Sequence, residues 1–177
     1  MGGRMVRVFS KSGEPVKTIG ANQLERPTGL AIDRTRRRIY VADSSRQASM
    51  NHRVRVFDFS GKWLSDLGAK PGRPTKGTDP GQWHFPTYIA LDSEGNVYVS
   101  DSMNFRIQIF KPDGEFVKTF GENGDGPGNF ARVKGLAFDS FGNLYAVDGG
   151  HSLVQMFNKD FAVLMAFGGY SQRLEWF

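Results

Sequence analysis

Residues 86–121 read PTYIALDSEGNVYVSDSMNFRIQIFKPDGEFVKTFG, and this stretch decides the fold of the chain. It contains four runs of strand length, TYIALD, NVYVSD, RIQIFK and EFVKTFG, in which apolar, aromatic or alternating residues predominate. Between the runs lie SEGN, DSMN and PDG, whose Gly, Asn, Asp and Pro residues favour turns. The stretch therefore predicts a four-stranded antiparallel meander. Because such a meander has two apolar faces, it needs further copies of itself to bury both.

The same pattern occurs three times in the chain. Each copy has an Asp at the end of its first strand, an Asp at the end of its second, a Phe at the end of its third and a Gly at the end of its fourth. These residues are Asp33, Asp43, Phe57 and Gly68 in the first unit, Asp92, Asp101, Phe110 and Gly121 in the second, and Asp139, Asp148, Phe157 and Gly168 in the third. The second and third units are 47 residues apart (92 to 139, for example), a repeat length typical of a β-propeller blade. The first unit lies further from the second, which indicates insertions in its loops.

The sequence therefore predicts an all-β protein, a single partial β-propeller over residues 1–177. Full blades of four antiparallel strands are expected over residues 27–68, 86–121 and 133–168. Residues 5–20 match only the third and fourth strands and predict a half-blade, and residues 169–177 are interpreted as a truncated connection. Since propellers close by pairing strands from the two chain ends within one blade, we expect an incomplete ring in this chain. Either the chain is a fragment of a longer propeller, or copies self-associate to complete a ring, or the open end stays frayed.

The composition argues against several kinds of chemical site. The chain has no Cys, which excludes disulfides, thiolate metal sites and cysteine nucleophiles. Its histidines are His52, His84 and His151, whose spacing does not match a zinc site. No nucleophile motif or phosphate-binding glycine fingerprint occurs in a suitable context. We therefore expect no catalytic residues, no metal and no cofactor.

Charge and hydropathy leave the compartment open. The formal net charge of +5 is a modest excess that would favour anionic partners. No run approaches the roughly 18 consecutive apolar residues of a membrane span, so no membrane insertion is expected. The first residues, MGGRMVRVFSKSGE, also lack the apolar segment of a secretory signal.

Three short motifs give the units a family resemblance. Residues 27–33 read PTGLAID, residues 95–101 read GNVYVSD and residues 104–110 read NFRIQIF. This pattern resembles NHL repeats, and it is most similar to the six-bladed NHL propellers of bacteria, many of which are exported. The third unit departs from it, because His151 and Leu153 replace the Asn and Arg of the last motif.

The resemblance implies a non-catalytic binding scaffold that recognises a protein, peptide or carbohydrate through preformed loops on one face. Two alternatives follow from the same resemblance. One is a lyase-like propeller, since some relatives cleave hydroxyglycine peptides with metal-binding histidines, Tyr and Arg. The other is a propeller that binds single-stranded RNA on a basic surface.

The expected ligand surface follows from the topology of a meander. Loops between second and third strands emerge on the same face as the connections between units, and both insertions of the first unit fall there, at Ser45–Asn51 and Ala69–Phe85. Long loops on a rigid scaffold commonly carry binding function. The candidate ligand-face residues are Arg46, His52, Lys70, Arg73 and Lys76. A second basic group, Arg34 and residues 36–38, is predicted on the opposite face, which weighs against one continuous RNA track.

Other repeated positions are interpreted as structural. Asp43, Asp101 and Asp148 are expected to accept backbone N–H bonds and to close the turn after the second strand. Arg53 and Arg106 are expected to join these carboxylates in a polar network. An apolar residue precedes each unit and is predicted to seal adjacent blades; these residues are Leu24, Trp83 and Phe130.

Overall fold

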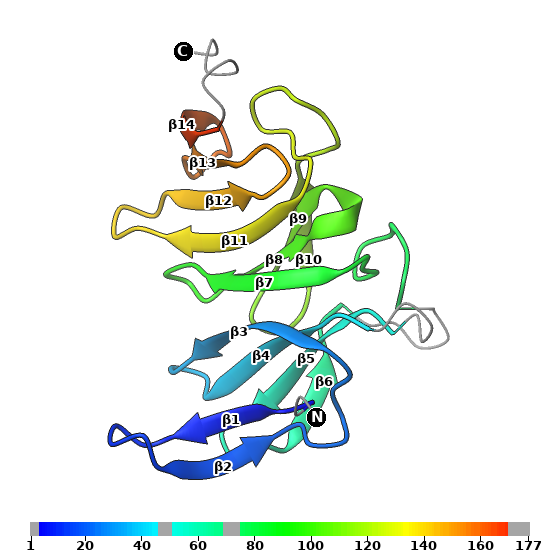
Figure 1. The fold of residues 1–177 in the computed structure, drawn as a ribbon, viewed down its shortest axis with the longest axis vertical. Helices are drawn as coiled ribbons and strands as arrows, with labels where there is room; N and C mark the ends of the chain where they lie inside the picture. Colours follow the sequence, from blue (N-terminus) through cyan, green and yellow to red (C-terminus); the bar gives the residue numbers. More distant parts are fainter. Residues whose placement is uncertain (1–3, 46–50, 69–74, 170–177) are drawn as a thin grey trace.

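The computed structural model describes residues 4–45, 51–68 and 75–169. These residues form an N-terminal two-stranded sheet and three four-stranded antiparallel sheets, each in simple meander order (Figure 1). The two-stranded sheet contains β1 (Val6–Phe9) and β2 (Pro15–Ile19). The first four-stranded sheet contains β3 (Pro27–Asp33), β4 (Arg38–Asp43), β5 (Arg53–Asp58) and β6 (Trp63–Asp66).

The second four-stranded sheet contains β7 (Pro86–Leu91), β8 (Val97–Asp101), β9 (Arg106–Phe110) and β10 (Phe116–Phe120), with a short 3-10 helix, η1 (Ser102–Asn104), between β8 and β9. The third contains β11 (Val133–Phe138), β12 (Leu144–Asp148), β13 (Leu153–Phe157) and β14 (Val163–Gly168). The first strands β3, β7 and β11 are neighbours in space, so the sheets are arranged as blades (Figure 1). Within the described residues the sheets do not close into a ring. The predicted all-β propeller with three full blades and a half-blade is confirmed.

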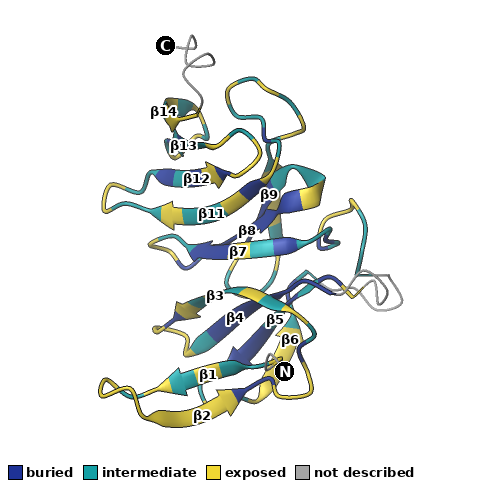
Figure 2. Ribbon diagram, viewed as in Figure 1, coloured by how far each residue is buried: buried dark blue, intermediate teal, exposed yellow. Residues whose placement is uncertain are grey.

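The core consists of three apolar clusters, each of which lies between neighbouring sheets. One joins the two-stranded sheet to the first blade, with Ile19 and Leu24 against Phe57. The second and third clusters join the first blade to the second and the second to the third. The middle strands of the blades are accordingly the most buried ones (Figure 2). The fold is therefore stabilised between blades as much as within them.

The predicted seals between blades are confirmed. Leu24, Trp83 and Phe130 are 2%, 1% and 0% exposed, and each belongs to a different cluster of the core. Trp83 lies in the connection before β7, where its ring centroid is 5.5 Å from that of Phe110. One residue thus ties the connection between two blades to the interior.

The turn before each fourth strand requires a left-handed backbone. Gly61 and Gly114 occupy it with φ of 95° and 97°, as glycine does without steric cost. In the third blade the same position is Phe161, with φ of 66°. A bulky side chain in this region costs on the order of 1 kcal/mol or more, so the third blade accepts strain that the others avoid.

No helix within the described part of the chain has the length and apolar character needed to cross a membrane.

The seal by Trp83 can be tested by truncation. Trp83→Ala should lower the free energy of unfolding by about 3–5 kcal/mol, because it leaves a large cavity between two blades. The matched control is Trp63→Ala on β6, whose side chain is 45% exposed and should cost about 1 kcal/mol. Urea denaturation followed by circular dichroism measures both, and equal losses would contradict the assigned role of Trp83.

Candidate functional site

The loops after the second strands and the connections between blades lie at one end of the sheets, on the right in Figure 1. We call this end the loop face; its described residues are 20–26, 44–45, 51–52, 75–85, 102–105 and 122–132, with 149–152. The turn face is the opposite end and carries the turns inside each blade, residues 34–37, 59–62, 92–96, 111–115, 139–143 and 158–162.

A buried carboxylate holds each connection of the loop face. Asp43 is fully buried at the end of β4, and its Oδ1 accepts the N–H groups of Glu25 and Arg26, both at 2.8 Å. Asp148 accepts the corresponding N–H groups of Ala131 and Arg132 at 2.8 and 2.9 Å. In the second blade, Asp101 accepts the N–H of His84 at 2.6 Å. Each carboxylate therefore fixes the chain that enters its own blade.

These donors correct part of the sequence interpretation. The turn after the second strand was expected to supply them, and in the third blade Gly150 and His151 do donate N–H bonds to Asp148. The bonds common to all three blades instead come from the preceding connection. The cause is strand register, because the start of the first strand pairs with the end of the second. Burial pushes the pKa of Asp148 upward, but the N–H donors outweigh it and hold the pKa below its usual value.

Arg53 and Arg106 extend the same network. Arg53 donates from Nε to Asp43 Oδ2 at 3.1 Å and from Nη2 to the carbonyl of Gln23 at 2.9 Å. Arg106 donates to Asp101 at 2.9 Å and to the carbonyl of Gln82 at 3.1 Å. Their guanidinium groups are thus committed to backbone and carboxylate partners within the chain.

The sequence analysis did not identify a second set of side chains, in the middle of the third strands, that hydrogen-bond to the connections between blades. Gln108 on β9 accepts the N–H of Gly81 at 3.0 Å and donates to the carbonyl of Gln82 at 2.8 Å. Gln155 on β13 likewise accepts from Gly128 and donates to the carbonyl of Asn129, both at 2.8 Å. In the sequence, the only signal is a polar residue in the centre of an otherwise apolar strand.

His52 differs from its expected place on the ligand surface. The side chain is 2% exposed, and its ring centroid lies 4.5 Å from that of Phe85 and 5.7 Å from that of His84. Its Nδ1 is buried without a hydrogen-bond partner in the structure of the described residues. Burial, with repulsion from His84 and Lys76, lowers the pKa of His52 from 6.5 to about 4. His52 is therefore neutral at pH 7 and contributes packing between two blades rather than surface charge.

The other candidate residues of the ligand face are placed only in part. Lys76 is half-buried next to an isolated β-bridge with Trp83, and its charge acts on His52 and His84. Arg46, Lys70 and Arg73 lie outside the described residues. The structure thus brings His52 and Lys76 to the junction of the first two blades.

His52 and His151 lie in equivalent loops of two blades, but their side chains contact different kinds of residue. His151 contacts Asp125 through Nε2 at 2.8 Å and Asp148 through Nδ1 at 2.9 Å, whereas His52 contacts aromatic rings. Among the residues that the structure describes, no group of three or more His, Asp or Glu side chains could hold a metal ion.

Comparisons with known proteins agree with this architecture. A family model described as NHL repeat matches residues 24–57, and one described as 6-bladed beta-propeller matches residues 89–160. NHL repeat-containing protein 3 of Homo sapiens is 30% identical over 113 residues, which span 63% of this chain and 29% of the human protein.

Two solved structures share the fold. A streptogramin B lyase aligns with a TM-score of 0.66 and 13% identity over 97% of this chain and 50% of that one. A chain of the nidogen/laminin complex aligns with a TM-score of 0.67 and 18% identity over 94% of this chain and 61% of that one. At such identities the likeness shows the fold alone.

The fold and its loop face thus define a β-propeller of four-stranded antiparallel blades. The matches to an NHL-repeat model and to a 6-bladed beta-propeller model relate the chain to the NHL-repeat β-propellers, and what it comprises is a partial propeller. It spans 29% of the length of the human relative. Because that relative is human, the predicted similarity to bacterial members stays a prediction.

Acid unfolding tests the buried state of His52. The unfolded chain has a His pKa of about 6.5, so it takes up the proton before the folded state does as the pH falls. Stability should be full above pH 6.5 and should decline towards pH 4. His52→Phe, the residue type at the equivalent Phe105, should reduce the loss between pH 7.5 and 4.5 by about 2 kcal/mol.

Urea titrations at the two pH values measure this difference. The lowered pKa of His84 acts in the same direction and remains in the variant, so the slope should shrink without vanishing. An unchanged pH dependence in His52→Phe would show that His52 protonates as freely in the folded state as in the unfolded one.

Proposed function

We propose that this chain is a non-catalytic binding scaffold that recognises a protein, peptide or carbohydrate through its loop face. The observation that carries the proposal is the network beneath that face. Buried Asp43, Asp101 and Asp148 hold the connections to the sheets through bonds of 2.6–2.9 Å. Loops held in this way lose little conformational entropy when they bind a partner.

The family gives the same general role. NHL-repeat propellers commonly act as binding and scaffold modules, and the nidogen/laminin neighbour is a chain of a protein complex. We place the contact surface at the junction of the first two blades, to which His52 and Lys76 belong. Its proposed residues are Arg46, Lys70, Arg73 and Lys76, and the described part of this junction contains the packed rings of His52, His84 and Phe85.

The lyase-like alternative has the fold in its favour, since streptogramin B lyase aligns over most of the chain. It requires a metal-binding centre. Metal analysis of the purified protein discriminates the two, because a stoichiometric divalent metal would favour the enzyme.

The RNA-binding alternative predicts an affinity that falls steeply with salt. Against it, Arg36 and Arg38 of the turn face are bonded to the backbone of the second blade.

Removing the proposed cations tests the loop face. Ligands are first selected on the wild-type protein with a peptide display library and a glycan array. The triple variant Arg46→Ala, Arg73→Ala and Lys76→Ala should bind these ligands at least tenfold more weakly. The melting temperature should change by no more than about 2 °C, because charged loop residues outside the core usually contribute little to stability. Binding is measured by biolayer interferometry.

The matched control removes three cations from the other end of the sheets. Arg34, Lys11 and Lys62 are exposed residues of turns inside the sheets, so their Ala substitutions change the net charge equally. Selected ligands should bind this control like the wild type. Equal weakening by both triple variants would indicate a general charge effect and would remove the loop face from consideration.

Self-association to complete a ring remains a further proposal. It is supported by Val147, Met165 and Phe167 of the third blade, which are 42%, 52% and 45% exposed. We expect sedimentation velocity at micromolar concentration to detect a dimer that Met165→Lys dissociates. A monomer at all concentrations would contradict it.

A further inference from the structure

Arginine side chains close the turn-face end of the junction between the first and second blades. Arg38, at the start of β4, donates from Nη1 to the carbonyl oxygen of Pro112 in the second blade. The hydroxyl of Tyr40 donates to the same oxygen at 3.4 Å. Beside it, Arg36 donates to the carbonyl of Glu94 at 3.2 Å and to Asp33 at 3.2 Å. Two guanidinium groups therefore occupy this end of the junction.

The next junction has equivalent strand pairing, but it has no arginine at the corresponding place and its turn after the first strand is one residue shorter, Asp92 to Asn96 against Asp33 to Arg38. Ile39 and Val97 both pair with the Phe that ends the third strand, so Asn96 corresponds to Arg38, Tyr98 to Tyr40 and Lys159 to Pro112. Asn96 is shorter than Arg and turns back, donating from Nδ2 to Asp92 at 2.8 Å. Across the described chain, no side chain of the second blade donates to the carbonyl oxygen of Lys159.

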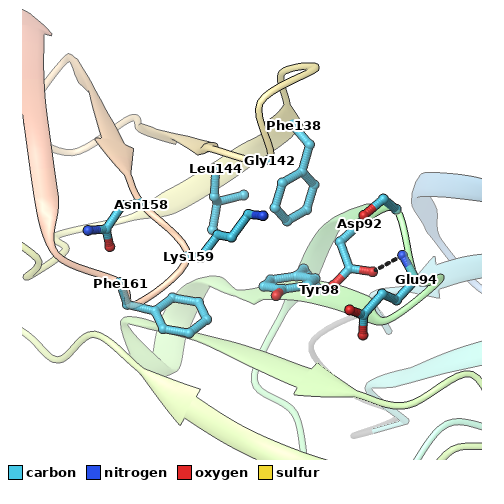
Figure 3. A pocket seen from close by; sticks show the side chains of 10 residues that line it. Asp92, Glu94, Tyr98, Phe138, Gly142, Leu144, Asn158, Lys159 and Phe161 are labelled. Atoms are coloured by element: carbon cyan, nitrogen blue, oxygen red, sulfur yellow. Dashed lines mark hydrogen bonds between the residues drawn. The ribbon is translucent and has the colours of Figure 1, made fainter.

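A cavity of about 210 Å³ lies where the guanidinium groups would be. Figure 3 shows its walls: Asp92, Glu94 and Tyr98 come from the second blade, and Phe138, Lys159 and Phe161 come from the third. Pockets for drug-sized ligands measure roughly 300–1,000 Å³, so this cavity suits a single side chain.

One wall of the cavity is formed at a cost in backbone strain. Phe161 occupies the left-handed turn position that is Gly114 in the second blade. Its ring lies in the cavity wall, 4.5 Å from Phe120 and 6.4 Å from Tyr98 between ring centroids. The Nζ of Lys118 already lies 3.8 Å from the centre of the Phe161 ring, so the ring accepts a cation on one side. Backbone strain of this kind occurs at binding and catalytic sites, and in this chain Phe85 and Phe105 have the same left-handed conformation.

The chemistry of the walls favours a planar cation. Two carboxylates, those of Asp92 and Glu94, line the cavity together with the ammonium group of Lys159, and the Lys118 ammonium lies against the Phe161 ring. Tyr98 and Phe138 meet edge to face at 4.8 Å and present aromatic surface. Burial and the charges of Asp92 and Glu94 raise the pKa of Tyr98 to about 12, so its hydroxyl stays protonated.

We propose that this cavity between the second and third blades binds the guanidinium group of an arginine side chain presented by a peptide. The bound group takes the place that Arg38 fills one junction earlier. The Lys159 carbonyl corresponds to the acceptor of Pro112, Glu94 supplies the counter-charge, and Tyr98, Phe138 and Phe161 supply ring faces. Guanidinium suits the site better than ammonium, since it is planar, weakly hydrated and stacks on aromatic rings. The site lies on the turn face and does not depend on the proposed role of the loop face.

A pair of peptides tests the proposal directly. The probe is acetyl-Gly-Arg-Gly-amide, and its control carries citrulline, which is neutral and nearly identical in shape. Titration of the isotope-labelled protein followed by NMR should shift resonances of Tyr98, Phe138 and Phe161 with the arginine peptide. The citrulline peptide should bind at least tenfold more weakly. Equal binding of both, or no shift at these residues with 10 mM arginine peptide, would overturn the proposal.

Variants locate the site. Asn96→Arg gives the second blade an arginine at the position equivalent to Arg38. The new side chain should fill the cavity and abolish peptide binding. Glu94→Gln should weaken binding at least fivefold, and Lys159→Gln should tighten it by removing a competing cation. Glu14→Gln, an exposed carboxylate of the two-stranded sheet, is the matched control and should change nothing.

Each variant is first checked for folding by circular dichroism. Glu94→Gln keeps the test valid if Asn96→Arg does not fold, since Glu94 is exposed and makes few contacts. Unchanged affinity in Glu94→Gln would place the peptide elsewhere. The triple loop-face variant of Arg46, Arg73 and Lys76 should bind the arginine peptide like the wild type, so failure of one site leaves the other to stand.

Discussion

The buried carboxylate at the end of each second strand is the interaction on which the architecture depends. In each blade, pairing of the first and second strands brings the incoming connection against this end, and unpaired N–H groups of that connection must find acceptors there. Asp43, Asp101 and Asp148 accept them. An apolar residue in place of the carboxylate would leave these part-buried donors without their acceptor, each at a cost of about 1–3 kcal/mol. The carboxylates at the strand ends thus fix the backbone of the loop face to the sheets.

The same network allows adjacent blades to pack. Each connection carries an apolar residue into the interior directly before the N–H groups that the carboxylate accepts: Trp83 precedes His84, and Phe130 precedes Ala131. Polar pairing therefore fixes the position of the apolar seal. The third blade shows that the outer members of the network are replaceable. Leu153 stands in place of Arg53 and Arg106, and in this blade His151 links Asp148 to Asp125 of the connection, while Gln155 bonds the connection as Gln108 does in the second blade.

Much of the fold could be predicted from the sequence because a repeat shows its own pattern several times. The strands, the seals and the structural character of the Asp positions follow from residues at equal places in successive units. The arginine partners of those Asp residues were predicted, but their backbone N–H partners were not, since these depend on register between strands, which a linear pattern does not display. The burial of His52 escaped prediction for a similar reason. It results from contact with Phe85, 33 positions away, and nothing near His52 in the sequence indicates that contact.

Repetition also makes departures from the pattern informative. When equivalent junctions share backbone geometry, a substitution in one of them can be compared with the residue that fills the other. Arg38 and Gly114 accompany a closed first junction, whereas Asn96 and Phe161 at the equivalent places accompany an open second junction with left-handed backbone at Phe161. A glycine at the place of Phe161 would relieve the strain and remove one aromatic wall of the cavity. The comparison of equivalent junctions therefore directs attention from the long loops to the short turns at the other end of the sheets.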